Sequence, residues 1–263
     1  MPAVKGILIF SSIFLYIICG LFTHMFSLLF RRGQRRMIIS RLTRVLSRSI
    51  RSNLGIKLDL RGELSYFKEK GNFIVSNHLG YLDGIILSSL FPSIFVTKSQ
   101  VRSWPVFGWM SRAGCTIYID RKKKLGAKET VARISEALNE GLNVIFFPEG
   151  TSTDGSRILP FQQGYFQAPI NSGTPVIPVT IQYTKINSEN LNLKNRDKVC
   201  WYGQAGLMEH ISGVLKQRSV EATITVHPKI EMRAYDPGLA RIRSQISDDS
   251  LKAILRAYKL INS

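Results

Sequence analysis

The sequence predicts an α/β fold in which helices cover a mixed, largely parallel sheet, preceded by a membrane helix and a basic amphipathic helix. Three observations lead to this prediction. Beyond Lys57, apolar runs rich in β-branched and aromatic residues alternate with segments of helical periodicity, as in parallel sheets. Residues 6–30 are almost continuously apolar, and residues 37–51 alternate aliphatic residues with arginines. A chain of 263 residues is long enough for one well-buried domain with an appendage.

The apolar stretch 6–30 is long enough to cross a membrane, for which about 20 apolar residues are needed. A secretory signal peptide would have a shorter apolar region and a small-residue cleavage site, so we expect an uncleaved anchor. The sequence leaves open whether this helix spans the bilayer or re-enters. If it spans, the arginines that follow it should stay inside. The domain would then lie on the cytoplasmic face, at the inner membrane if the chain is bacterial.

Residues 37–51 have helical spacing, with an aliphatic stripe opposite the arginines. Such a basic amphipathic helix is suited to lie on anionic lipid headgroups, although a surface helix packed on the domain has the same pattern. We therefore predict two parts. Residues 1–56 form a membrane anchor with the basic helix, and residues 57–263 form the main domain.

The formal net charge of +18 indicates an anionic partner. Much of this charge lies beside the apolar stretch, because residues 1–58 contain no Asp or Glu and carry the following ten cations: Lys5, Arg31, Arg32, Arg35, Arg36, Arg41, Arg44, Arg48, Arg51 and Lys57. No nucleic-acid-reading motif accompanies them, so we expect membrane lipids and no nucleic acid as partners. The three cysteines are widely spaced and indicate a reducing compartment.

The domain contains six predicted strands and four predicted helices, assigned from β-branched runs and from 3.6-residue periodicity. The strands are Asn72–Ser76, Ile94–Lys98, Thr116–Asp120, Asn143–Phe147, Val176–Tyr183 and Val220–Val226. The helices are Leu82–Leu90, Ala127–Leu138, Gln163–Asn171 and Ser250–Ile261.

The first candidate site follows the strand that ends at Ser76. Polar residues at the exit of a strand, with a helix behind them, stand where α/β folds place their chemistry. Histidine titrates near neutral pH and suits the removal of a proton from a hydroxyl. A carboxylate on the other ring nitrogen would fix its tautomer. His78 and Asp83 lie close enough across a turn to form this pair, so we predict that they are the catalytic residues.

Two further strand ends carry candidate binding residues. Arg121 ends the third strand, and its planar guanidinium is suited to grip a phosphate or carboxylate, although a salt bridge with Asp120 is the plainer interpretation. Glu149, Gly150 and Thr151 end the fourth strand. Glu149 could accept a hydrogen bond from a hydroxyl or anchor a cation, and Gly150 would let backbone amides approach an anion. The same three residues could equally form an ordinary turn.

The sequence indicates no covalent intermediate and no cofactor. It has no G-x-S-x-G motif, and no cysteine lies in a reactive context. His24, His78, His210 and His227 do not have the spacing of metal ligands, so we expect neither a metal nor a bound organic cofactor.

Taken in their order along the chain, the motifs at the three strand ends resemble those of the glycerolipid acyltransferase family, which includes the lysophosphatidic acid acyltransferases. The resemblance covers about residues 71–183. It depends mainly on Asn77-His78 with Asp83 and on Phe147-Pro148-Glu149-Gly150-Thr151. It implies an enzyme of phospholipid biosynthesis that moves a fatty acyl group from acyl-CoA or acyl carrier protein to the free hydroxyl of lysophosphatidate, giving phosphatidate.

By the same resemblance, specific roles fall on residues of this chain. His78 is implied as the base and Asp83 as its partner. Arg121, Glu149 and Gly150 are implied to bind the glycerol phosphate, and Thr151 continues that motif. The family's amino-terminal helices sit in the membrane, in keeping with residues 6–51.

The sequence departs from the family pattern at two positions: the first affects the expected local backbone geometry, and the second leaves the acceptor open. Cys115 occupies a position where the family commonly has glycine, and Ser152 follows Thr151 where the family commonly has arginine. Arg157 is a candidate replacement for that arginine. Longer versions of this loop resemble enzymes that acylate lyso-ornithine lipid, so this lipid or another lysolipid is the alternative acceptor. A non-enzymatic membrane protein and a thioester hydrolase are the remaining alternatives, and the oligomeric state is not indicated.

Overall fold

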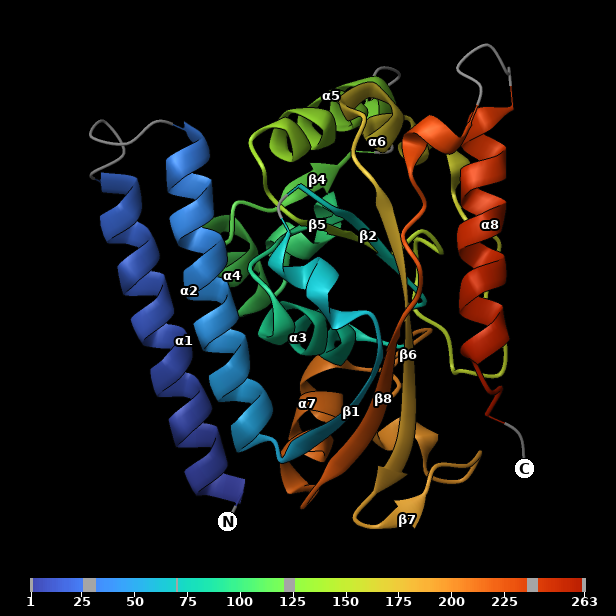
Figure 1. The fold of residues 1–263 in the computed structure, drawn as a ribbon. Helices are drawn as coiled ribbons and strands as arrows, with labels where there is room; N and C mark the ends of the chain where they lie inside the picture. The colour runs from blue at the N-terminus through green and yellow to red at the C-terminus, as the bar shows by residue number, and fades with distance from the viewer. Residues whose placement is uncertain (1, 26–31, 70, 121–125, 236–240, 262–263) are drawn as a thin grey trace.

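The computed structural model describes residues 2–25, 32–69, 71–120, 126–235 and 241–261. Its helices alternate with the strands of a single eight-stranded sheet (Figure 1). The strands are β1 (Ile56–Gly62), β2 (Phe73–Ser76), β3 (Ile94–Lys98), β4 (Ile117–Ile119), β5 (Val144–Phe146), β6 (Val176–Ile186), β7 (Glu189–Asn190) and β8 (Val220–Val226). The α-helices are α1 (Pro2–Met25), α2 (Arg32–Asn53), α3 (Tyr81–Leu90), α4 (Phe107–Ala113), α5 (Gly126–Asn139), α6 (Gln167–Ser172), α7 (Leu207–Lys216) and α8 (Ile242–Ala257).

The predicted fold class is confirmed. The strand order is β1-β8-β6-β2-β5-β3-β4, with β7 paired to β6. Every pair is parallel except β6 with β8 and β6 with β7, which are antiparallel. Because β2 lies between β5 and β6 and is parallel to both, the loops after β2 and β5 emerge at the same edge of the sheet.

The strands β2 and β5 are apolar except for Ser76, the last residue of β2, because both faces of the sheet are covered. Ile74 of β2 points into the core shared with α2, α3 and α7, whereas its neighbours Phe73 and Val75 point into the core on the side of α5 and α8. This alternation is the period of a strand, and burial on both sides removes the need for polar residues. Figure 1 shows α1 and α2 on one side of the sheet and α8 on the other.

Several predicted elements need correction. The segment predicted as one helix over Gln163–Asn171 is a 3-10 turn, Gln163–Phe166, followed by the short helix α6. The carboxyl-terminal helix predicted at Ser250–Ile261 lies earlier, at Ile242–Ala257. Its core contacts Ile246, Ser250 and Ile254 recur every four residues, and two of its four buried positions are serines, which a search for apolar periodicity misses. β1, β7, α4 and α7 were not predicted.

The helix α1 contains Ala3–Thr23, which among the described helices is the one long and apolar enough to cross a membrane. One side of α1 packs on the protein: the hydroxyl of Ser12 lies 2.9 Å from that of Ser49, and the hydroxyl of Tyr16 lies 2.8 Å from that of Thr43. Its other side exposes large apolar side chains, including Ile7, Phe10, Phe14, Leu15, Leu21 and Phe22.

The apolar stripe of α2 packs on the domain. Of the two arrangements considered for residues 37–51, the structure shows the surface helix packed on the domain. Ile39, Leu46 and Ile50 are buried, while the arginines Arg41 and Arg48 remain exposed. The start of α2 is attached to α5 by ion pairs. Arg36, whose side chain is 8% exposed, lies 2.9 Å from Glu140, and Arg32 lies 2.7 Å from Glu136. The boundary predicted between residues 56 and 57 stays a prediction.

Candidate active site

The loop 77–80 joins β2 to α3 and carries His78. It is held at its start by the side chain of Asn77, which is 1% exposed. The amide nitrogen of that side chain donates to the carbonyl of Ile181, and its oxygen accepts from the N–H of Ile181, both at 2.9 Å. Asn77 therefore pairs with β6 much as another strand residue would, which sets where the chain turns toward His78.

The structure brings His78 and Asp83 together, as predicted. Nδ1 of His78 lies 2.9 Å from Oδ2 of Asp83, whose side chain is fully buried. The same oxygen accepts from the N–H groups of Leu79 at 2.6 Å and Gly80 at 2.9 Å. A carboxylate oxygen with these donors makes Nδ1 the protonated ring nitrogen, so the lone pair available to a substrate proton is on Nε2.

The imidazole ring itself is positioned by stacking. It lies parallel to the ring of Phe147, with 4.1 Å between centroids and 16° between planes. The side chain of His78 is 22% exposed, unlike that of Asp83. The ring is thus supported on one face by Phe147 and at Nδ1 by Asp83.

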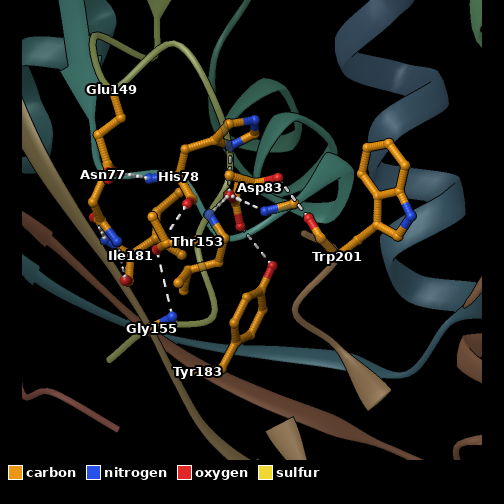
Figure 2. Close-up of polar contacts among 12 residues, drawn as sticks. Asn77, His78, Asp83, Glu149, Thr153, Gly155, Ile181, Tyr183 and Trp201 are labelled. Atoms are coloured by element: carbon orange, nitrogen blue, oxygen red, sulfur yellow. Dashed lines mark hydrogen bonds and ion pairs between the residues drawn. The ribbon is translucent and has the colours of Figure 1, made fainter. Parts of the chain in front are cut away.

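The backbone of His78 is held from the loop that follows β5 (Figure 2). Its N–H donates to Oε1 of Glu149 at 2.7 Å, and its carbonyl accepts from the N–H of Thr153 at 2.9 Å. The carbonyl of the next residue, Leu79, accepts from the N–H of Trp201 at 2.8 Å. These bonds satisfy buried backbone groups that the loop could not pair within itself. The backbone of His78 is therefore held in place by segments distant in the sequence.

Gly80 is required by close approach. A Cβ at this position would lie 2.9 Å from the backbone nitrogen of Trp201, too close for any side chain without a backbone shift. This contact brings the backbone of Trp201 against the start of α3, where the rings of Trp201 and Tyr81 are tilted neighbours with centroids 6.2 Å apart. The glycine before α3 therefore allows the wall containing Trp201 to approach His78.

Glu149 is buried, and both of its oxygens contact backbone amides. Oε1 accepts from His78 as above, and Oε2 accepts from the N–H of Leu159 at 2.8 Å. Burial raises the pKa of Glu149 to about 7, and the two N–H bonds oppose that rise. The substrate-binding role expected of Glu149 stays a prediction. Its geometry favours a different one, in which the carboxylate holds the His78 backbone in place.

Replacing Glu149 with Gln is expected to lower both stability and kcat at pH 8, where the native carboxyl is ionised. The amide places an N–H₂ group against one of two buried N–H donors, at a cost of about 1–3 kcal/mol for an unsatisfied group. Thermal unfolding and steady-state kinetics measure the two effects. Glu189→Gln, at an exposed position, is the matched control. A variant with native stability and native kcat would show that this carboxylate does not hold His78.

A cavity of about 370 Å³ lies beside His78. Its wall includes Gly150 and Thr151 and is otherwise mainly apolar, reaching Tyr16 of α1, Leu46 of α2 and Met110 of α4. Among the described residues, Lys98 at the end of β3 is the one lining side chain, besides His78, that carries or gains a positive charge. The cavity can therefore hold a long apolar group beside the imidazole.

The predicted binding residues have different positions. Gly150, with φ +68°, and Thr151 lie on the cavity wall, whereas Glu149 is not among the described residues that line it. Arg121 lies outside the described residues. Arg157 is exposed and is likewise not among the described lining residues. The hydroxyl of Ser152, where the family commonly has arginine, donates to the carbonyl of Trp201 at 2.6 Å.

Sequence reasoning assigned no role to four residues that hold His78 and Asp83: Asn77, Thr153, Trp201 and Tyr183, whose hydroxyl donates to Oδ1 of Asp83. Asn77 belongs to the motif Asn77-His78, and its position beside His78 was the only sequence feature that pointed to a role for it. Thr153, Tyr183 and Trp201 act through contacts with segments far away in the sequence. Cys115, noted as a departure from glycine, adopts φ +53°, a conformation that favours glycine. Within the described residues, no group of three or more His, Cys, Asp or Glu could hold a metal ion; the expectation of no cofactor stays a prediction.

The chain is similar to several known proteins. Residues 58–182 match the family model described as Acyltransferase. The lyso-ornithine lipid O-acyltransferase of Rhizobium meliloti (strain 1021) is 33% identical over 65% of this chain and 60% of that protein. The corresponding protein of Rhodobacter capsulatus is 30% identical over 84% of this chain and 80% of its own length. The 1-acyl-sn-glycerol-3-phosphate acyltransferase of Neisseria meningitidis serogroup B is 33% identical over 52% of this chain and 54% of that protein.

The crystal structure of the 1-acyl-sn-glycerophosphate (LPA) acyltransferase PlsC from Thermotoga maritima has the same fold. It superposes with a TM-score of 0.62 over 98% of both chains at 18% identity. The level of identity to the Rhodobacter capsulatus protein over most of that protein's length, together with the match to the family model, shows that this chain belongs to the Acyltransferase family.

Proposed function

We propose that this protein transfers a fatty acyl group from a thioester donor to the free hydroxyl of a lysolipid, with His78 as the base. The observation that carries the proposal is the contact of His78 with the buried Asp83, beside a cavity whose wall is mainly apolar. The pair supplies a general base, and the cavity is suited to an acyl chain. The Acyltransferase family membership supports the same reaction.

In the proposed reaction, Nε2 of His78 removes the proton from the lipid hydroxyl as its oxygen attacks the thioester carbonyl. A carbon–oxygen bond forms, and the tetrahedral intermediate collapses with cleavage of the carbon–sulfur bond. The imidazolium then returns the proton to the leaving thiolate. The negative charge of Asp83 stabilises the imidazolium while it exists. Acyl-CoA and acyl carrier protein are both suitable donors for this chemistry.

Lysophosphatidate is the acceptor that the family motifs imply, and lyso-ornithine lipid is the second candidate. Two observations favour the second. The relatives from Rhizobium meliloti and Rhodobacter capsulatus carry that name and align with more of this chain than the Neisseria protein does. In addition, Ser152 stands where the family commonly has an arginine for phosphate, and it is used to bind the Trp201 carbonyl.

The test is acyl transfer by the purified protein in lipid vesicles that contain one acceptor at a time. Lysophosphatidate and lyso-ornithine lipid are offered separately with acyl-CoA, and the product is identified by its mass. A diacyl product from either lipid supports the proposal and identifies the acceptor. Release of free fatty acid at the same rate with and without acceptor would instead indicate a thioester hydrolase.

Arg121 is proposed to bind the acceptor headgroup. It follows β4, which ends at Ile119, and because β4, β3, β5 and β2 are parallel, the carboxyl end of β4 is at the same end of the sheet as His78. Arg121→Ala is expected to raise the KM for the acceptor more than it lowers kcat, because headgroup binding is largely the same in the ground and transition states. Arg133→Ala, on the exposed side of α5, is the control. An unchanged acceptor KM would reject this role.

The apolar helix α1 and the family membership indicate membrane association. We propose further that the catalytic domain lies on the cytoplasmic face. Two observations support this proposal. Arg32 and Arg36 form ion pairs with α5, so the arginine-rich start of α2 lies beside the domain, and arginines next to a membrane helix usually stay cytoplasmic. Protease added to inside-out vesicles should digest the domain. Digestion only in vesicles of the opposite orientation would contradict this placement.

A further inference from the structure

Tyr183 contacts the carboxylate that orients the base, from a strand far along the chain. It belongs to β6, is 1% exposed, and its hydroxyl donates to Oδ1 of Asp83 at 2.8 Å. Figure 2 shows its ring pointing from β6 toward Asp83, on the side of the carboxylate away from His78. No motif of the sequence includes this residue.

The two oxygens of Asp83 have separate partners. Oδ2 accepts from Nδ1 of His78 and from the N–H groups of Leu79 and Gly80, while Oδ1 accepts from Tyr183. The torsion that turns a carboxylate about its Cβ–Cγ bond is broad and roughly two-fold, so it is weakly restrained by itself. A donor on Oδ1 restrains this torsion and therefore sets the direction in which Oδ2 meets the imidazole.

The hydroxyl of Tyr183 acts only as a donor here. Burial and the adjacent charge of Asp83 both raise the pKa of Tyr183 well above its usual value, so the phenol stays protonated. The surrounding core is aliphatic and includes Ile181, Val179 and Ile224. Phenylalanine would fill such a core without introducing a polar atom, whereas a buried hydroxyl needs a partner to offset its desolvation. The partner of this hydroxyl is the catalytic carboxylate.

The strand β6 contacts one residue before His78 in the sequence, Asn77, and one residue after it, Asp83. The backbone of Ile181 pairs with the side chain of Asn77, and two residues later the side chain of Tyr183 bonds to Asp83. The first contact uses the backbone of Ile181, which lies in the plane of the sheet, and the second uses the side chain of Tyr183. His78 lies between the two residues that this strand holds.

We infer that Tyr183 is a positioning residue of the acyl-transfer site, which orients Asp83 and through it the imidazole of His78. The inference rests on the proposed function, because it assigns to Tyr183 an effect on a base that acts in acyl transfer. Tyr183 is not among the described residues that line the cavity, so we expect it to act through Asp83 and not on the substrate.

The test is Tyr183→Phe in the full-length protein, which removes one oxygen atom and keeps the ring. The expected result is a fall in kcat of about tenfold, the lower end for a lost hydrogen bond to a charged group, with the KM for both substrates unchanged. Tyr235→Phe is the matched control: its hydroxyl also donates to a carboxylate, that of Asp249 at 2.7 Å, near α8. This control should keep the native kcat.

A second comparison separates orientation of Asp83 from a general effect on the fold. In an Asp83→Asn background, Tyr183→Phe should change kcat by less than about twofold, because the charged group through which it acts is absent. Equal losses in both backgrounds, a raised KM, or a native kcat in the single variant would overturn the inference. His78→Ala, measured in parallel, reports on the proposed function: if that variant stays active, the base assignment itself has failed.

Discussion

Replacing His78 with alanine is expected to lower kcat for acyl transfer by about 10²- to 10⁴-fold, the usual contribution of a general base. The structure explains why the fold should survive. The bonds from His78 to Glu149 and Thr153 use its backbone, which alanine keeps. Asp83 keeps three donors, from Leu79, Gly80 and Tyr183, so no buried charge is left unpaired.

The measurement is the initial rate of transfer in vesicles, with thermal unfolding as the check on folding. His227→Gln is a suitable control. His227 directly follows β8 and forms a hydrogen bond with the hydroxyl of Thr180, and neither residue is among the described residues that line the cavity. It should retain the native rate. A His78→Ala variant that retains a large part of the native kcat would mean that another group removes the proton.

The second large effect is expected for Asp83→Asn, with kcat lowered by about 10²- to 10⁴-fold, as when the carboxylate of a catalytic triad is replaced by an amide. The amide oxygen is expected to take the place of Oδ2, since that position faces two backbone N–H groups. The imidazole would then keep a hydrogen-bond acceptor at Nδ1 but lose the negative charge that stabilises the imidazolium.

This reasoning predicts a specific kinetic pattern for Asp83→Asn. The KM values should change little, because Asp83 is fully buried and is not among the described residues of the cavity wall. Steady-state kinetics with both substrates varied measures this pattern. A variant with raised KM values and a native kcat would place the carboxylate in substrate binding and contradict its role beside His78.

The central part of the fold could be predicted from the sequence because both faces of the sheet are buried. The runs Phe73–Val75 and Val144–Phe146 are apolar at every position, and this pattern has few alternatives. β1 was missed because it is an edge strand with one buried residue, Ile56, and it carries Lys57, Asp59 and Arg61. α4 spans seven residues, too few for helical periodicity to show.

The contact between His78 and Asp83 could be predicted because the two residues are close in sequence and lie at a strand end. Their supporting contacts could not. The bonds of Asn77 with Ile181 and of Asp83 with Tyr183 join positions 104 and 100 residues apart. Each depends on β6 lying beside β2, a pairing that no local pattern encodes. For the same reason, Glu149 was identified as a site residue, but its contacts with backbone amides were not foreseen.

The most direct test of the central claim is chemical rescue of His78→Ala by added imidazole. The variant leaves a space bounded by the ring of Phe147 and the carboxylate of Asp83, the two groups that hold the native imidazole. Imidazole in the buffer is expected to restore acyl transfer in a concentration-dependent manner and to give the same ester product. Transfer by the variant at the native rate without imidazole would contradict the claim that an imidazole at this position removes the proton.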